Sequence, residues 1–159
     1  MNKIDKIALV IEGGGFKSVF TAGVLDAFLI NQFNPFHIYI GVSSGAMALS
    51  YYISGQYKSY FELSKQVCVN DEFLSYTHVL SEQGYMDLKF LTKYAKKNNP
   101  LKLERIEKSI DDSEFYIVAT SLDNGQAVYL EPNKKNIYRC LRATSSLPFF
   151  TKGSCKVNG

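Results

Sequence analysis

The stretch IYIGVSSGAMALS, residues 38–50, joins two kinds of sequence. Its first residues are β-branched or aromatic, which predicts a strand, and residues 46–53 have almost no polar face, which predicts a buried central helix. Between them, Gly41, Ser43 and Gly45 form the pattern G-x-S-x-G. Small residues on both sides of a serine permit a sharp strand-to-helix turn that presents a nucleophile at the edge of a sheet.

The same turn also has a purely structural interpretation. Serine commonly caps a helix, and Ser43 could serve only that purpose. In the functional interpretation, Ser43 Oγ lies at the carboxyl edge of the sheet, where open α/β sheets bind ligands. Ser44 is then the first helical residue and contributes its amide, so the helix N-terminus favours negative charge developing beside Ser43. The G-x-S-x-G pattern alone does not decide between the two.

A second strand–turn–helix pattern lies earlier in the chain. Residues 7–11, IALVI, form a continuous apolar run, which predicts a strand buried on both faces. Residues 13–15 are all glycine and end this run. Apolar residues at helical spacing follow and predict an amphipathic helix: Phe20, Val24 and Phe28. Because glycine has no Cβ, the amides of this turn can approach a ligand closely, and we expect them to form an oxyanion hole for Ser43.

Two other designs that use glycine-rich turns fit the chain poorly. A Rossmann G-x-G-x-x-G needs a third glycine, which would fall at Ser18, and an acidic residue at the end of the second strand; the chain has neither. A P-loop needs a glycine before its Lys-Ser pair, whereas Lys17 and Ser18 follow Phe16. Phosphate or nucleotide binding by this turn is retained as a third hypothesis, which a thermal-shift assay with nucleotides tests.

The rest of the chain alternates helical and strand patterns. Residues 56–87 are the least regular, and we expect a helix there followed by a mobile cover. The other predicted elements are helices over 88–97 and 103–110, and strands over 115–122 and 127–130 that form a hairpin around Asp123-Asn124-Gly125. Helices alternating with buried strands, plus one hairpin, predict an α/β fold with a mainly parallel central sheet.

Composition limits the classes of protein to which the chain can belong. With 159 residues, 46% of them hydrophobic and 21% charged, it predicts a single globular domain. The net charge of +3 is too small for the basic surface of a nucleic-acid binder, so no nucleic-acid partner is expected. The apolar run near the N-terminus is too short for a signal peptide or a membrane span. We therefore expect a cytoplasmic protein, with signal-independent export left open.

The cysteines predict neither a disulfide framework nor a metal site. Cys68, Cys140 and Cys155 are far apart in the chain and include no C-x-x-C pair. Free thiols fit a reducing compartment.

The histidines do not predict a Ser-His-Asp triad. His37 lies on the same extended segment as Ser43, about 20 Å away at about 3.3 Å per residue, so it cannot reach the serine oxygen. His78 lies in the irregular segment and would approach only by loop folding. A carboxylate that contacts the serine directly is the remaining base.

Several motifs together resemble those of the patatin-like phospholipase family. They occur in the family's order and span nearly the whole chain: Gly13-Gly14-Gly15-Phe16-Lys17, Gly23-Val24-Leu25, Gly41-Val42-Ser43-Ser44-Gly45-Ala46 and Ala143-Thr144-Ser145-Ser146-Leu147-Pro148. The resemblance implies a three-layer α/β/α sandwich and a lipid acyl hydrolase. Such an enzyme acts through a Ser-Asp dyad, without metal or other cofactor, on phospholipids, lysophospholipids or other lipid esters, and makes peripheral contact with membranes.

The resemblance also assigns roles to single residues. Ser43 matches the nucleophile. Gly13, Gly14, Gly15 and Phe16 match the oxyanion loop, and Lys17 occupies the family's Arg/Lys position. Gly41, Ser44 and Gly45 complete the G-x-S-x-G motif. Where the family often has glycine after the basic residue, this chain has Ser18, which we expect to cap the next helix.

The family's catalytic aspartate is missing from these matches. It opens a D-G-G or D-G-A motif soon after the A-S-x-x-x-P-like segment, and the chain ends at Gly159 before any such motif. Asp123 precedes that segment and is interpreted as the hairpin tip. Val157-Asn158-Gly159 is typical of a strand and turn with no strand to follow. We therefore interpret residues 1–159 as the N-terminal portion of a single patatin-like domain, cut off at its C-terminal end.

A chain without its base is expected to be nearly inactive, with ester hydrolysis lowered by about 10² to 10⁴. The alternative is a non-catalytic acyl-binding or regulatory protein that keeps the patatin fold. An Asp-Gly pair in the reading frame beyond Gly159 would favour the enzyme, and its absence would favour the binding protein.

Overall fold

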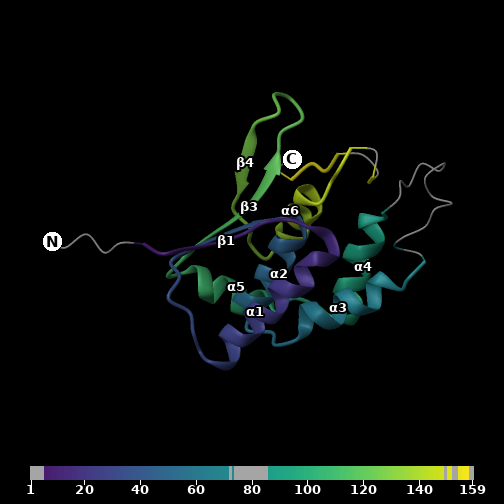
Figure 1. Cartoon of the computed structure of the whole chain (residues 1–159). Helices are drawn as coiled ribbons and strands as arrows, with labels where there is room; N and C mark the ends of the chain where they lie inside the picture. The colour runs from purple at the N-terminus through teal and green to yellow at the C-terminus, as the bar shows by residue number, and fades with distance from the viewer. Residues whose placement is uncertain (1–5, 72, 74–85, 149, 152–153, 158–159) are drawn as a thin grey trace.

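A four-stranded sheet organises the part of the chain that the computed structural model describes, which comprises residues 6–71, 73, 86–148, 150–151 and 154–157 (Figure 1). The strands are, in spatial order, β1 (Ala8–Ile11), β2 (Ile38–Val42), β3 (Glu114–Thr120) and β4 (Ala127–Leu130). β1 and β3 both pair parallel with β2, and β4 pairs antiparallel with β3. The predicted α/β fold with a mainly parallel sheet is confirmed.

The helices of the described residues gather around α2. They are η1 (Gly15–Lys17, a 3-10 helix), α1 (Ser18–Ile30), α2 (Ser43–Ile53), α3 (Ser59–Cys68), α4 (Leu88–Asn98), α5 (Leu103–Ile110) and α6 (Ile137–Thr144). α1, α3, α5 and α6 pack against α2, and α4 packs against α6 (Figure 1). None of the described helices is both long enough and apolar enough to cross a membrane.

α2 is the central helix, as its sequence predicts. Ala46, Leu49 and Ser50 are fully buried, and the Ser50 hydroxyl donates to the Ala46 carbonyl oxygen at 2.8 Å. Glycine at position 41 makes close packing possible, because a Cβ there would lie 2.6 Å from Ala46 Cα. The first turn of α2 therefore lies directly against the end of β2.

The two faces of the sheet differ in exposure. On the face toward the helices, Tyr39, Phe115 and Ile117 are buried. On the opposite face, Val10 is 65% exposed, and the described helices, which pack together around α2, do not cover it. The prediction that residues 7–11 are buried on both faces is therefore wrong for the described structure. β1 is an edge strand here, so its apolar run reflects burial on one face only.

α1 turns inward a different face from the one that its spacing predicts. Ser18, Ala22 and Leu25 are buried, whereas Phe20 is 81% exposed and Val24 is 39% exposed. The helix has a single charged residue in its sequence SVFTAGVLDAFLI, so periodicity does not select one face. Small side chains lie toward α2 because they let the two helices approach closely.

Most other predicted elements are present. α4 and α5 match the predicted helices, and β3 and β4 form the predicted hairpin, whose turn contains Gly125 at φ +71°. α3 supplies the helix expected in residues 56–87, while the expected cover falls on residues 74–85, which lie outside the described residues, as do Asn158 and Gly159. The sequence patterns do not predict α6.

Candidate active site

Ser43 lies where β2 passes into α2, in a strained backbone conformation. Its φ is +51°, in the left-handed region that residues other than glycine seldom adopt. Both flanking glycines are sterically required. A Cβ on Gly45 would lie 2.2 Å from the carbonyl oxygen of Glu12, and one on Gly41 would clash with α2. The turn is as sharp as the G-x-S-x-G pattern predicts.

The side chain of Ser43 does not cap α2. Val42 is the N-cap residue and makes no side-chain capping bond, and α2 begins at Ser43 rather than at Ser44. Ser43 is half-buried, and its hydroxyl has no hydrogen-bond partner among the described residues. The hydroxyl is therefore not engaged in holding this part of the fold together, which counts against the structural interpretation.

The triple-glycine turn lies directly against Ser43. A Cβ on Gly13 would lie 3.0 Å from Ser43 Cβ and 3.7 Å from Ser43 Oγ. Only a residue without a side chain fits this contact without displacing the serine. The two turns, which are about 30 residues apart in the chain, thus meet at the carboxyl end of β1 and β2, where the parallel strands end side by side.

The three glycine amides of this turn are not equivalent. The Gly14 N–H donates to Ser44 Oγ at 3.1 Å. The N–H groups of Gly13 and Gly15 donate to no acceptor among the described residues. Gly15 adopts φ +56°, a conformation that favours glycine. The Gly13 and Gly15 amides are therefore available to a ligand, whereas the Gly14 amide is engaged.

Phe16 and Lys17 continue the turn as η1. The Lys17 N–H donates to the Gly14 carbonyl oxygen at 3.2 Å, and a Cβ on Gly14 would lie 3.4 Å from Lys17 Cε. Lys17 is exposed, and Phe16 is 41% exposed with its ring edge-on to that of Phe73 at 6.3 Å. The lysine stem thus covers the glycine turn while its ammonium group faces solvent.

Ser18 does not cap α1, so that prediction is wrong. The N-cap residue is Lys17, and Ser18 is the first residue of the helix. The Ser18 hydroxyl donates instead to the Gly15 carbonyl oxygen at 2.7 Å. Its side chain therefore bonds back to the glycine turn rather than forward to the helix.

Thr144 fixes the Ser43 turn from a distant part of the chain. The Ser43 N–H donates to Thr144 Oγ1 at 2.8 Å, and Thr144 Oγ1 donates to the carbonyl oxygen of Val118 in β3. Thr144 is the last residue of α6 and is buried. The next residue, Ser145, is also buried, and its hydroxyl has no partner among the described residues. The motif at residues 143–148 is visible in the sequence, but the contact with Ser43 is not.

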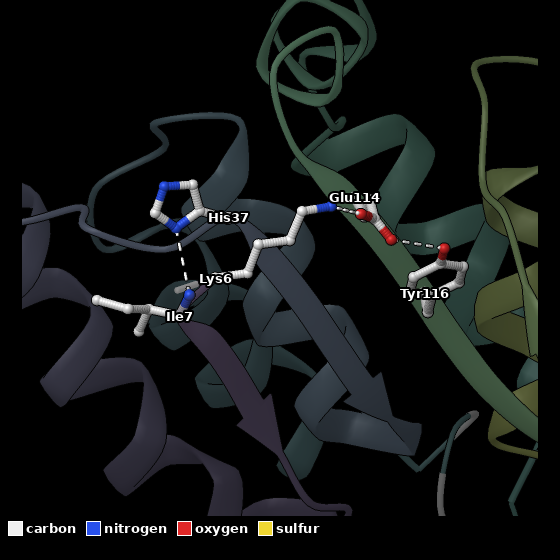
Figure 2. Close-up of polar contacts among 5 residues, drawn as sticks. All are labelled: Lys6, Ile7, His37, Glu114 and Tyr116. Carbon is white, nitrogen blue, oxygen red and sulfur yellow. Dashed lines mark hydrogen bonds and ion pairs between the residues drawn. The ribbon is translucent and has the colours of Figure 1, made fainter. Parts of the chain in front are cut away.

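His37, the histidine among the described residues, is not placed as a base for Ser43. His37 lies at the amino end of the sheet, where its Nδ1 accepts a hydrogen bond from the Ile7 N–H at 3.3 Å (Figure 2). His78 lies outside the described residues. Asp123 is exposed in the hairpin turn. Among the described residues, no carboxylate bonds to Ser43, and no group of three or more His, Cys, Asp or Glu side chains is placed to hold a metal ion.

Comparison with known proteins decides the family. The sequence model of the family described as Patatin-like phospholipase matches residues 9–155. The chain belongs to this family. The match includes the glycine turn, the Ser43 turn and the segment that contains Thr144, so it covers every part of the site described above.

The chain is also similar to two other proteins. "Uncharacterized protein YjjU" of Escherichia coli (strain K12) is 34% identical over 155 residues, which cover 97% of this chain and 43% of that protein. The chain therefore spans less than half the length of this curated relative. A crystal structure of SpcU in complex with ExoU, from the type III secretion system of Pseudomonas aeruginosa, contains a chain that is 14% identical. The alignment covers 90% of this chain and 38% of that chain, with a TM-score of 0.49.

Proposed function

We propose that the patatin-like chain carries the nucleophile of a lipid acyl hydrolase, and that the nucleophile is Ser43. The observation that carries the proposal is the Ser43 hydroxyl, which no described side chain or backbone group engages and which is held at a strained turn beside Gly13. Strained backbone conformations of this kind persist mainly where function requires them. Membership of the patatin-like phospholipase family supports lipid esters as the substrate class.

In the proposed reaction, Ser43 Oγ bonds to the carbonyl carbon of the ester and its proton passes to a carboxylate base. The alcohol of the ester leaves with that proton, which leaves an acyl group on Ser43. Water then attacks the acyl carbon and gives a proton to the base. Ser43 Oγ leaves, regains that proton and releases the fatty acid. The acid product and the free serine complete the cycle.

Negative charge on the ester oxygen is stabilised by the loop that contains Gly13, Gly14, Gly15 and Phe16. Within this loop the amides of Gly13 and Gly15 are available as donors, whereas the Gly14 amide already donates to Ser44. Preorganised backbone donors of this kind contribute about 10² to 10³ each in rate. The first turn of α2, which begins at Ser43, adds the positive end of its dipole.

The base is proposed to be an aspartate encoded beyond Gly159. No described carboxylate bonds to Ser43, and the chain spans 43% of its Escherichia coli relative. On this proposal the 159-residue chain hydrolyses esters slowly, and the chain extended through any further reading frame hydrolyses them faster by about 10² to 10⁴.

A fluorophosphonate probe tests the nucleophile. We expect mass spectrometry of the labelled, extended protein to find the adduct on Ser43, and Ser43→Ala to abolish both the adduct and ester hydrolysis. Ser50→Ala is the matched control, because it makes the same change on the same helix away from the turn. An adduct on any other residue would overturn the assignment. A protein that binds fatty acid but forms no adduct would instead be the acyl-binding alternative.

Peripheral contact with a lipid surface is part of the same proposal. Phe16 of η1 and Phe20 and Val24 of α1 follow the glycine turn at intervals of four residues, and all three are exposed. Because these side chains continue from the turn, a bilayer that contacts them would lie next to the site.

Co-sedimentation with vesicles tests this contact. The chain should sediment with vesicles of anionic phospholipid, and Phe20→Ser should reduce the bound fraction several-fold. Ile30→Ser, at the far end of α1 and 63% exposed before substitution, should not. Equal losses from the two substitutions would refute the contact.

A further inference from the structure

Buried hydroxyl groups from three helices gather beneath the triple-glycine turn. Tyr60 of α3 is 7% exposed, and its hydroxyl lies 2.6 Å from the hydroxyl of Ser18 at the start of α1. Ser44, in the first turn of α2, and Ser64 of α3 are also buried. Burial raises the pKa of Tyr60, and the hydroxyls of Ser18, Ser64 and Ser44 oppose that rise. α3 packs against both α1 and α2, which brings these residues together (Figure 1).

The direction of the hydrogen bonds follows from counting protons. The Ser18 hydroxyl gives its only proton to the Gly15 carbonyl oxygen, at 2.7 Å, so toward Tyr60 it can only accept. Tyr60 therefore donates to Ser18. Burial raises the pKa of Tyr60 above its ordinary value, which keeps that proton in place at neutral pH. Ser44 Oγ accepts from the Gly14 N–H at 3.1 Å, so it holds the turn at a second point.

Two separate sets of contacts restrain the same turn. The Gly14 N–H donates to Ser44 Oγ, and Tyr60 donates to Ser18, which in turn donates to the Gly15 carbonyl oxygen. In a buried site the Tyr60–Ser18 and Ser18–Gly15 bonds polarise and so reinforce each other. Consecutive glycines have the greatest backbone freedom of any sequence, and these hydroxyls restrain two of the three.

We infer that Tyr60, Ser18 and Ser44 are positioning residues that hold the triple-glycine turn in register with Ser43. The inference rests on the proposed function, because it concerns the amides of the same oxyanion loop. Donors that stabilise developing charge must be held within about 0.5 Å of their working position. Fixing Gly14 and Gly15 through their own N–H and carbonyl groups leaves the Gly13 and Gly15 amides free to face the reacting ester.

Tyr60→Phe tests the inference, and Tyr51→Phe is its matched control. Tyr51 is equally buried and its ring packs against that of Tyr60, but its hydroxyl donates to the Asn99 carbonyl oxygen, at 2.6 Å, and not to the glycine turn. Each substitution removes one buried hydroxyl and keeps the ring. We expect Tyr60→Phe to lower kcat by about 10- to 100-fold with KM changed less than about 2-fold, as for other supporting contacts. Tyr51→Phe should leave both values within about 2-fold.

A second measurement does not depend on activity. Amide hydrogen exchange of Gly14, followed by NMR in the 159-residue chain, should be faster in Tyr60→Phe than in Tyr51→Phe, because the adjacent Gly15 is no longer held through Ser18 and the turn opens more often. Ser18→Ala should have the same effect on both readouts if Tyr60→Phe fails to fold, with Ser50→Ala as its control.

The outcomes separate the two proposals. Equal kcat values and equal Gly14 exchange in Tyr60→Phe and Tyr51→Phe would overturn the positioning role, even if Ser43→Ala is inactive. Faster Gly14 exchange in Tyr60→Phe, together with unchanged ester hydrolysis in Ser43→Ala, would support the positioning role and overturn the proposed function instead.

Discussion

The two ends of the parallel sheet are built in opposite ways. At the amino end, Lys6 pairs with Glu114, and the Tyr116 hydroxyl donates to Glu114 Oε2 at 2.9 Å (Figure 2). The side chains of Lys6 and Glu114 are 59% and 40% exposed. At the carboxyl end, glycines meet a strained serine at contact distance, and the polar groups beneath them are buried hydroxyls without formal charge.

The difference shows which end of the sheet is constrained. Exposed ion pairs tolerate change because water solvates either partner when the other is removed. Close backbone contacts do not, because an added carbon has no space and a lost hydroxyl leaves a buried partner unsatisfied. His37, a chemically versatile side chain, lies at the tolerant end, which is why its presence in the sequence does not mark the site.

Among the substitutions that test this difference between the two ends, Gly45→Ala is expected to lower the stability of the fold most. The new Cβ would lie 2.2 Å from the Glu12 carbonyl oxygen, so the glycine turn and α2 would have to separate. We expect the free energy of unfolding to fall by about 3 kcal/mol or more, measured by urea denaturation. Gly23→Ala is the control, since nothing lies within 4 Å of its new Cβ, and it should raise stability by about 0.5 to 1 kcal/mol. Similar unfolding free energies for Gly45→Ala and Gly23→Ala would show that the carboxyl end of the sheet is not constrained in this way.

Thr144→Val is expected to have an intermediate effect at the same end. It keeps the shape of the side chain but leaves the Ser43 N–H without its acceptor and the Val118 carbonyl oxygen without its donor. Unfolding free energy should fall by about 1 to 3 kcal/mol, and fluorophosphonate labelling of Ser43 should slow.

Two controls accompany this prediction: one keeps the hydroxyl at position 144, and the other removes a hydroxyl elsewhere. Thr144→Ser retains the group and should restore the labelling rate. Thr120→Val, at the exposed end of β3, should change stability by less than about 0.5 kcal/mol. Normal labelling in Thr144→Val would show that the contact does not position Ser43.

Glu114→Gln is expected to have the smallest effect, at the amino end. The Lys6 ammonium, and then the Tyr116 hydroxyl, lower the pKa of Glu114 through their hydrogen bonds. A lowered folded-state pKa contributes stability above the unfolded-state value, and that contribution is lost as the pH falls through the folded-state value. The Tm difference between the native chain and Glu114→Gln should therefore be small at pH 7 and vanish in acid. A difference that grows on acidification would contradict this account of the pair.

Local sequence patterns predict the strand–turn–helix units, because an apolar run followed by small residues at fixed spacing is compatible with few structures other than a sharp turn between a strand and a helix. Gly41, Ser43 and Gly45 are an example, and the hairpin around Gly125 is another. The meeting of Gly13 with Ser43 is also predictable, because parallel strands that pair side by side end at the same edge.

Other features depend on packing between distant segments and leave no local pattern. α1 is apolar on nearly all sides, so its inward face is decided by the small residues that fit against α2. Tyr60 lies 42 residues beyond Ser18, in a stretch without clear periodicity, and only the fold brings their hydroxyls together. Thr144 belongs to a recognisable motif, yet nothing in its neighbours reveals that Ser43 is its partner.

The positive φ of Ser43 implies a conflict between folding and chemistry at a single position. Glycine adopts +51° with little strain, whereas alanine meets the same steric resistance as serine. A chain with glycine at position 43 should therefore have a higher Tm than both the alanine variant and the natural protein, although it lacks the hydroxyl. Serine at this position therefore lowers the stability of the fold. The difference in unfolding free energy between the glycine variant and the natural protein measures how much stability is given up to keep the hydroxyl.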